Sequence, residues 1–200
     1  ASLTGTGQFG DQLVLTRDGN SLAVSAPGSG EIFLYDTSTS SVTPKANTLQ
    51  NTSVHSNGNF GYSLGLSDDC TRLFIGDPDY SNDVSDQYRD TGRVVIKEYD
   101  ATIDGGTGLP LGFSLGTEIE ITRGGTLQVA TDRHTRFGES LDVSGDGTRL
   151  IASRFGLLDT SFSGDPYTNL EISELWDRNS QTGNWSKKNL QSLVPIVTGS

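Results

Sequence analysis

The sequence has no methionine and a single cysteine, Cys70. One cysteine excludes an internal disulfide framework and cannot form a cysteine metal site by itself. The absence of an initiator methionine predicts that the chain is processed or belongs to something longer. No apolar run reaches the length of a membrane span, and no charged start followed by an apolar segment marks a signal peptide, so no membrane insertion is predicted.

Basic residues are also scarce: 14 Lys and Arg stand against 25 Asp and Glu, for a net charge of −11. Without a run of Lys or Arg, affinity for nucleic acid or anionic lipid is not expected, because both depend on neutralising phosphates. Only six prolines accompany 25 glycines, with abundant Ser, Thr, Asp and Asn. This composition predicts many tight turns between short segments, and therefore an all-β fold.

What the chain does have is a repeated frame, F-G-x-x-L-x-[LV]-[ST]-x-D-G-x-x-L, followed by an alternating strand that ends in aromatic and acidic residues. It begins at Phe9 (FGDQLVLTRDGNSL), Phe60 (FGYSLGLSDDCTRL) and Phe137 (FGESLDVSGDGTRL). An internal repeat is the first thing to establish, because it determines the whole architecture.

Each unit predicts four short antiparallel strands. In the third copy Leu141 and Val143 alternate with polar residues, as in a half-buried strand. Asp146-Gly147 then offers a two-residue hairpin turn with positive φ. A fourth strand is visible after the second copy within residues 112–124. Four antiparallel strands in each unit are typical of β-propeller blades.

The predicted organisation is one propeller-type domain with three repeats. Residues 1–8 are an edge strand or the end of a preceding blade, and the repeats span 9–59, 60–136 and 137–200. Propellers close with about four to eight blades, so further blades or other chains are expected to complete this one. The opening GTGQFG resembles a dinucleotide loop only in its glycines, because a strand and a hairpin turn follow it instead of a helix.

The repeat resembles the FG-GAP repeats of integrin-like β-propellers, which run from Phe-Gly through an Asp-Gly turn and a Gly-Ala-Pro step to a strand with Val and Tyr. The first copy fits throughout (FG…SAPGSGEIFLYD), the second in most positions (FG…IGDP…GRVVIKEY), and the third lacks Gly-Ala-Pro. The ending SQTGNWSKKNLQSL looks like the Trp-bearing fourth strand of such repeats. The resemblance implies an extracellular or cell-surface protein.

An acidic insertion in the second copy, residues 77–90, matches part of a calcium loop. The oxygen-bearing residues at loop positions 1, 3, 5, 7 and 12 are Asp79, Ser81, Asp83, Ser85 and Asp90. Position six is Val84 instead of glycine, and position twelve is Asp instead of Glu, so an acidic solvated loop is the alternative. Integrin-type calcium loops lie at the Asp-Gly turns, but the other carboxylates of that motif are missing around Asp18, Asp69 and Asp146, which predicts plain hairpin turns.

Catalytic signals are weak. Glu118 and Glu120 lie on one face of a strand, and the alternation of Ile119 and Ile121 makes that face the solvated one. His55 and His134 lie in polar segments, and no nucleophile, metal-protease, P-loop or C-x-x-C motif occurs. We therefore predict that the chain is not an enzyme.

Other single residues favour structural roles. Cys70 replaces the turn glycine of its copy, and Trp176 and Trp185 are expected to pack between blades. The sequons at Asn51 and Asn184 are possible glycosylation sites if the chain is secreted.

The sequence thus predicts a non-catalytic binding or adhesion module that presents variable loops, residues 77–90 and 156–168, to a protein or glycan partner. The alternative is an architectural subunit of a large extracellular assembly, or a fragment of a larger propeller protein. A third hypothesis, an enzyme that uses a propeller's central pocket, requires converging carboxylates or histidines.

Overall fold

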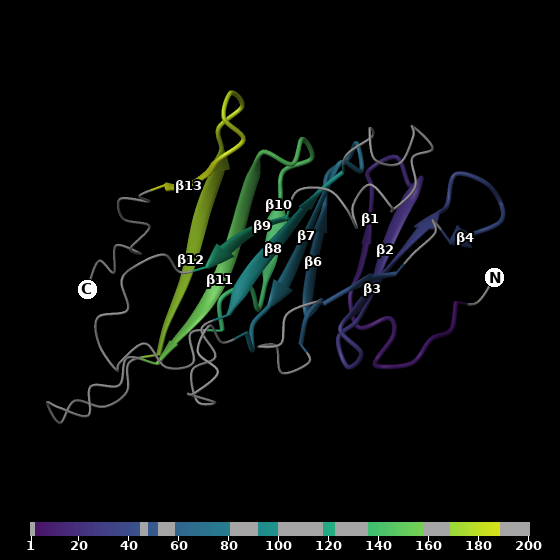
Figure 1. Cartoon of the computed structure of the whole chain (residues 1–200), viewed down its shortest axis with the longest axis horizontal. Coiled ribbons are helices and arrows are strands. Elements are labelled where there is room, and N and C mark those ends of the chain that lie inside the picture. Colours follow the sequence, from purple (N-terminus) through teal and green to yellow (C-terminus); the bar gives the residue numbers. More distant parts are fainter. Residues whose placement is uncertain are drawn as a thin grey trace, which may run out of the picture.

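A computed structural model describes residues 3–44, 48–51, 59–80, 92–99, 118–122, 136–157 and 169–188. Throughout these ranges the regular elements are β-strands, arranged as three antiparallel sheets that lie beside one another in chain order (Figure 1). The prediction of an all-β fold built from propeller blades in three repeats is confirmed; two of the blades have four strands, and the first has a fifth, short one. No helix long and apolar enough to cross a membrane occurs in this part of the chain.

Blade 1 contains β1 (Leu13–Leu15), β2 (Ser21–Ala26), β3 (Glu31–Asp36), β4 (Thr43–Pro44) and β5 (Leu49–Gln50). The first four pair in chain order. Two short pieces, β4 and β5, share the outer edge of β3, because β4 pairs with its end and β5 with its start. The described part of the first eight residues, 3–8, contains no strand.

Blades 2 and 3 repeat the meander. Blade 2 contains β6 (Ser63–Leu66), β7 (Arg72–Asp77), β8 (Arg93–Glu98) and β9 (Glu118–Thr122). Blade 3 contains β10 (Leu141–Val143), β11 (Arg149–Leu157), β12 (Asn169–Arg178) and β13 (Trp185–Lys188). Each strand pairs with the next along the chain.

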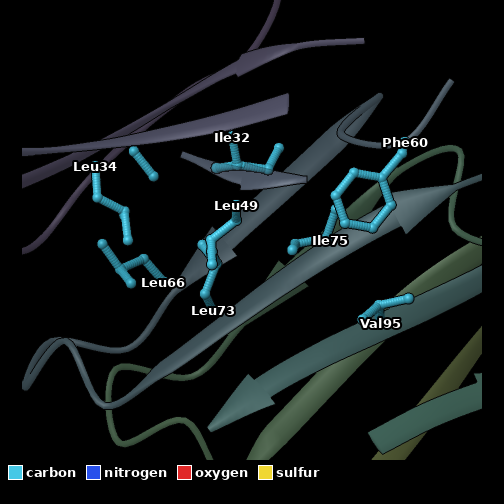
Figure 2. Close-up of a cluster of buried hydrophobic side chains, with 9 residues drawn as sticks. Ile32, Leu34, Leu49, Phe60, Leu66, Leu73, Ile75 and Val95 are labelled. Carbon is cyan, nitrogen blue, oxygen red and sulfur yellow. The ribbon is translucent and has the colours of Figure 1, made fainter. Parts of the chain in front are cut away.

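Every blade has two faces, because successive side chains of a strand point to opposite sides of the sheet. We call the side that meets the preceding blade face A and the side that meets the following blade face B. Face B of blade 1 and face A of blade 2 enclose the first core cluster (Figure 2). Its buried members are Ala23, Ile32, Leu34, Leu49, Phe60, Leu66, Leu73, Ile75 and Val95.

A second cluster fills the space between face B of blade 2 and face A of blade 3. Its buried members are Phe74, Val94, Ile96, Phe137, Leu150 and Ala152. Trp176 and Trp185 pack against it, and the rings of Phe74 and Trp185 meet edge to face at 5.7 Å. The prediction that both tryptophans pack between blades is confirmed.

The hairpin turns differ from the predicted form. The N–H of Gly147 donates to the carbonyl of Ser144 at 2.8 Å, and Gly147 has φ +62° whereas Asp146 has no positive φ. This is a four-residue loop, in which a tight turn ends in a left-handed residue. The two-residue turn expected at Asp146-Gly147 is therefore wrong, because Gly145 and Thr148 also belong to the loop, which the Ser144 N–H closes by donating to the Arg149 carbonyl. Cys70 occupies the left-handed position in blade 2 with φ +56°, as its alignment with the turn glycines predicted.

Candidate functional site

The two ends of the blade stack carry different polar groups. At one end the Phe-Gly segments enter the inner strands, and Asp79, just after β7, and Gly92, just before β8, lie beside them. We call this the Phe-Gly end. At the opposite end lie the turns between the first and second strands of each blade. We call this the hairpin end.

A buried ion pair joins β7 and β8 at the Phe-Gly end. Asp77 ends β7 and lies opposite Arg93, which begins β8. The Arg93 Nη2 atom lies 3.0 Å from Asp77 Oδ2 and donates to Asn51 Oδ1 of blade 1 at 3.2 Å. Its guanidinium stacks 4.0 Å from the ring centre of Tyr80. Since both charges are almost fully buried, this group holds blades together and is closed to ligands.

A second cluster at this end is more open. Arg136, directly before Phe137, donates from Nη1 to Asp79 at 2.5 Å and from Nε to Glu139 at 3.3 Å. Its guanidinium lies 5.8 Å from the ring centre of Tyr62, and Asn59 donates to the second oxygen of Asp79. We call these five residues the Arg136 cluster.

The side chain of Arg136 remains 29% exposed. Its backbone is left-handed, with φ +46°, as is that of Gln8 before the first Phe-Gly. A guanidinium has five N–H donors, and Asp79 and Glu139 each accept one of them. The cluster therefore presents a partly exposed, positioned cation flanked by two carboxylates.

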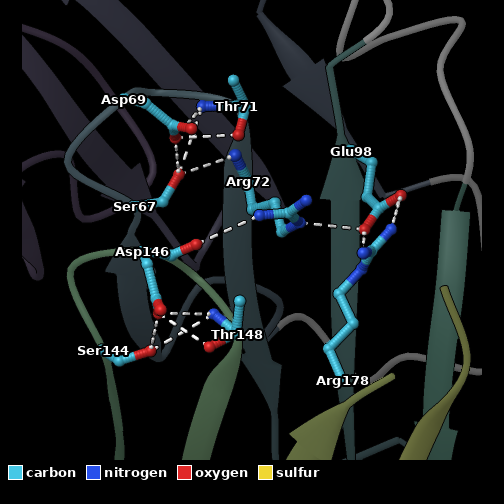
Figure 3. A network of polar contacts seen from close by, with 9 residues as sticks. All are labelled: Ser67, Asp69, Thr71, Arg72, Glu98, Ser144, Asp146, Thr148 and Arg178. Carbon is cyan, nitrogen blue, oxygen red and sulfur yellow. Dashed lines mark hydrogen bonds and ion pairs between the residues drawn. The ribbon is translucent and has the colours of Figure 1, made fainter. Parts of the chain in front are cut away.

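At the hairpin end, each turn folds around a carboxylate. Asp146 accepts from the hydroxyl of Ser144 at 2.6 Å and from the backbone and hydroxyl of Thr148 (Figure 3). These hydrogen bonds lower the pKa of Asp146 to about 2. Hydrogen bonds from Thr16 and then from Asn20 lower the pKa of Asp18 in the same way.

The turn of blade 2 has the same design. Burial opposes ionisation of Asp69, but hydrogen bonds from Ser67 and Thr71 outweigh it and hold the pKa of Asp69 below its usual value. The carboxylates at the three turns thus act as acceptors within their own loops, in agreement with the hairpin interpretation.

Two arginines cross between blades 2 and 3 at this end. The Glu98 carboxylate accepts from Arg72 Nε at 3.0 Å in its own blade and from Arg178 Nε at 2.8 Å in blade 3 (Figure 3). Arg72 Nη1 also donates to the carbonyl of Asp146 at 3.2 Å. All three side chains are at most 20% exposed, so this network is a link between blades.

Of the predicted calcium ligands, only Asp79 is described, and it is engaged by Arg136 and Asn59. The other four, Ser81, Asp83, Ser85 and Asp90, lie outside the described residues, as do His55 and His134. The described ranges contain no group of three or more His, Cys, Asp or Glu side chains placed to hold a metal ion. The calcium site stays a prediction.

The remaining predicted site residues differ in their surroundings, and some of them lie outside the described ranges. The sequon residue Asn51 accepts the hydrogen bond from Arg93, whereas Asn184 is exposed in the β12–β13 turn. Strand β9 places Glu118 opposite Lys97 and Glu120 opposite Val95 in register, and Ile119 packs against the second cluster. Residues 81–90 and 158–168 of the proposed partner-binding loops lie outside the described ranges.

Sequence reasoning missed the Arg136 cluster. Its members come from three segments: 59–62 before β6, Asp79 after β7, and 136–139 before β10. The only local signal was the arginine in TRFGES, where the other copies have glutamine and asparagine before Phe-Gly.

No family model and no curated protein sequence matches the chain. Solved structures with a similar fold include two proteins proposed to be 6-phosphogluconolactonases. The one from Bacteroides fragilis has 15% identity and a TM-score of 0.47, with 88% of this chain and 36% of that chain covered. The one from Bacteroides uniformis has 14% identity and a TM-score of 0.48, with 88% and 38% covered.

A third is the periplasmic gluconolactonase of Pseudomonas aeruginosa, with 13% identity, a TM-score of 0.43, and 89% and 38% covered. The chain thus spans well under half of the length of these proteins. At such identities the likeness is one of fold.

These comparisons correct the family assignment. The identification with FG-GAP and integrin-like repeats is wrong, because no family model matches and the similar structures just described are named as lactonases. The predicted non-catalytic adhesion function and its architectural alternative are wrong for the same reason. The prediction that the chain is not an enzyme is corrected by the same finding.

Proposed function

We propose that the Phe-Gly end binds a small hydroxylated molecule carrying a carbonyl or carboxylate group, and that Arg136 anchors it. One observation carries the proposal: the Arg136 guanidinium is fixed between Asp79 and Glu139 and remains 29% exposed. Guanidinium N–H groups recognise carbonyl and carboxylate oxygens, and the flanking carboxylates are acceptors for ligand hydroxyls.

The same arrangement suits hydrolysis of a sugar lactone, which has a carbonyl beside several hydroxyls. Water would add to the carbonyl carbon as Asp79 or Glu139 takes its proton, and Arg136 would stabilise the oxygen that becomes negative. The ring C–O bond then breaks, and the carboxylic acid formed by the carboxylate returns the proton to the departing ring oxygen. The product is a hydroxy acid, with one water consumed.

Hydrolysis of gluconolactone and 6-phosphogluconolactone by the 200-residue chain tests the reaction, with acid release measured against the spontaneous rate. Arg136→Gln is expected to lower kcat/KM by about 100-fold, the usual effect of removing a donor to a developing oxyanion. Arg17→Gln, an exposed arginine at the hairpin end, is the matched control and should change nothing.

Binding is measured separately, by calorimetric titration with gluconate. Binding that is lost in Arg136→Gln, with its melting temperature unchanged, supports the site. Binding without hydrolysis keeps the site and rejects the reaction. If the wild-type chain neither binds gluconate nor accelerates hydrolysis, or if Arg136→Gln does both as well as the wild type, the proposal is rejected.

Three earlier expectations remain separate proposals. Calcium binding by residues 79–90 would compete with the Asp79–Arg136 pair, so calcium should raise the melting temperature more in Arg136→Gln than in the wild type. The proposed location outside the cytoplasm is tested by fractionating the cells that make the protein. Glycosylation is tested by mass spectrometry of the same material, which would detect any sugar on Asn51 or Asn184.

A further inference from the structure

The residues that directly precede the three Phe-Gly pairs lie at the Phe-Gly end, and two of them meet on one carboxylate. These residues are Gln8, Asn59 and Arg136. Asn59, in the segment that enters blade 2, donates to Asp79 Oδ2. Arg136, in the segment that enters blade 3, donates to Asp79 Oδ1 at 2.5 Å. Both oxygens of Asp79 are therefore engaged, each by the entry segment of a different blade.

The charge of Asp79 is needed for the position of Arg136. The Asp79 side chain is only 16% exposed, and its ion pair with Arg136 is short. A proton taken up by Asp79 would neutralise the carboxylate and remove this ion pair. Arg136 would then lose its anchor at the moment when it has to stabilise a developing negative oxygen. Asp79 is thus suited to hold the cation and poorly suited to accept a proton.

Glu139 differs from Asp79 in both respects. It accepts one side-chain hydrogen bond, from Arg136 Nε at 3.3 Å, which is longer than the usual N–H···O range. Its side chain is 32% exposed, and its second oxygen has no hydrogen-bond partner within the described residues. Glu139 can therefore take up a proton while Asp79 keeps Arg136 in place.

The backbone that carries Glu139 is fixed on both sides. The Glu139 N–H donates to the Arg136 carbonyl at 3.1 Å. The N–H of Gly138 donates to the Ser153 carbonyl of blade 3 at 3.0 Å, and its carbonyl accepts from the Ser63 hydroxyl of blade 2 at 2.7 Å. A rigid turn thus presents a carboxylate that only one long hydrogen bond restrains, as a group that transfers protons requires.

We propose that Asn59 and Asp79 are positioning residues for Arg136, and that Glu139 takes the proton of the attacking water. This inference rests on the proposed function. Water adds to the lactone carbonyl carbon and gives one proton to Glu139, while Arg136 stabilises the carbonyl oxygen. As the ring C–O bond breaks, Glu139 returns that proton to the departing ring oxygen, so the carboxylate is regenerated and a hydroxy acid is formed.

Blade 1 supplies a matched control for Glu139. Asp11 follows its Phe-Gly pair as Glu139 does, and the Asp11 N–H donates to the carbonyl of Gln8 at 3.2 Å. Asp11 is exposed, and the residue before this Phe-Gly pair is an uncharged glutamine. Asp11→Asn therefore removes the same charge from the same kind of turn, without touching the Arg136 cluster.

The first experiment measures kcat and KM for gluconolactone by acid release, and gluconate affinity by calorimetric titration. Glu139→Gln should lower kcat by about 100-fold or more, the usual contribution of a general base. Its KM and gluconate affinity should stay near the wild-type values, because the amide oxygen of glutamine can still accept from Arg136 Nε. Asp11→Asn should leave all three quantities unchanged.

The positioning residues should give the opposite division between KM and kcat. Asp79→Asn should raise KM and the gluconate Kd by about tenfold, the effect of losing one hydrogen bond to a charged group. The fall in kcat should be smaller than that of Glu139→Gln. Asn59→Ala should change KM and Kd in the same direction by less, because the pair between Asp79 and Arg136 remains. A loss of fold alone would not separate KM from kcat in this way.

A second measurement does not depend on activity. Phenylglyoxal is a dicarbonyl that attacks guanidinium nitrogens, and mass spectrometry after digestion locates the modified arginines. Asp79→Asn should raise the rate of modification of Arg136 by about tenfold, because Nη1 is released. Asn59→Ala should raise it by less, and Glu139→Gln, which contacts Nε, should leave it near the wild-type rate. Arg93, with a side chain only 4% exposed, is the internal control for unfolding.

The results distinguish this inference from the proposed function. Hydrolysis that survives Glu139→Gln, or equal falls in kcat in Glu139→Gln and Asp79→Asn, would overturn the assignment of Glu139 while the function stands. A wild-type rate of Arg136 modification in Asp79→Asn would overturn the positioning role. A wild-type chain that does not hydrolyse the lactone rejects the proposed function and the role of Glu139 with it, whereas the modification of Arg136 still decides what Asn59 and Asp79 do.

Discussion

Face A of blade 2 and face A of blade 1 have the same pattern but different surroundings. Leu66 and Leu73 are 5% and 0% exposed against blade 1, whereas their equivalents Leu15 and Leu22 are exposed and half-buried. Val24, on the same face as Leu22, is fully buried. The difference shows that the repeated frame specifies a contact between blades, in addition to the sheet that contains it.

The phenylalanines of the frame repeat this comparison. Phe60 and Phe137 are 2% and 1% exposed between two blades. Phe9 is half-buried and meets Phe33 edge to face at 5.2 Å. In blade 1 the aromatic neighbour of the frame phenylalanine thus belongs to the same blade. Phe60 and Phe137 are also covered by the blade that precedes them.

The largest expected difference in the free energy of unfolding is between leucine substitutions on face A of blade 2 and on face A of blade 1. Leu66→Ala should lower the free energy of unfolding by about 2–5 kcal/mol, because it leaves a cavity between blades. Leu15→Ala should cost at most about 0.5 kcal/mol, because water already reaches this side chain. Urea unfolding at a concentration where the chain is monomeric measures both. Equal losses would mean that face A of blade 1 is covered by the chain itself.

A smaller difference in the free energy of unfolding is expected between alanine substitutions at two glycines of equal backbone conformation. Gly61 has φ +93° and Gly10 has φ +92°, so Ala is equally strained at both. Only at Gly61 would the new methyl group also press on Ile32 and Ser25 of blade 1. Gly61→Ala should therefore be more destabilising than Gly10→Ala by about 1–3 kcal/mol, the usual cost of overpacking.

Urea unfolding of both variants measures that difference, again with the chain monomeric. Since the strain at positive φ is common to them, the difference isolates the contact between blades 1 and 2. Identical losses would contradict a close approach of the blades at this position.

The blades were predictable because their signal is local and occurs three times. Alternation in LDV indicates one strand and the apolar RLIAS after the turn indicates the next, and the third copy is recognisable although it lacks Gly-Ala-Pro. The prediction of the turn was wrong because Asp-Gly is also typical of a two-residue hairpin. The longer loop differs by the hydrogen bonds that Asp146 accepts from the hydroxyl of Ser144 and the backbone of Thr148.

The candidate site was not predictable for a different reason. Arg136 and Asp79 are 57 residues apart in sequence and belong to blades 3 and 2. Their meeting depends on how blades stack, which the frame of one blade does not contain. The family assignment went wrong in a related way, since Phe-Gly and Asp-Gly meet the needs of a propeller blade in general and carry no information on ligand.

The turn residue of blade 2 allows a further test between copies. Cys70 has φ +56°, which strains a non-glycine residue, whereas blades 1 and 3 have Gly19 and Gly147 at this place. Cys70→Gly should raise the free energy of unfolding by about 0.5–1 kcal/mol, because relief of strain exceeds the added flexibility of the unfolded chain. Urea unfolding measures the gain. Cys70→Ala retains the strain and serves as the control, so a gain of the same size there would reject this explanation.

The smallest expected effect is a loss of stability at acidic pH, and it arises at the exposed turn of blade 3. Because hydrogen bonds lower the pKa of Asp146 to about 2 in the folded chain, against about 3.9 when unfolded, the unfolded state takes up a proton first as pH falls. The contribution of Asp146 is therefore complete above about pH 4 and is lost between about pH 4 and pH 2. Asp146→Asn should be less stable than the wild type at neutral pH, and the two unfolding free energies should converge as pH approaches 2. Asp142→Asn, at an exposed carboxylate on the neighbouring strand, controls for net charge, and the same convergence in that variant would assign the effect to charge alone.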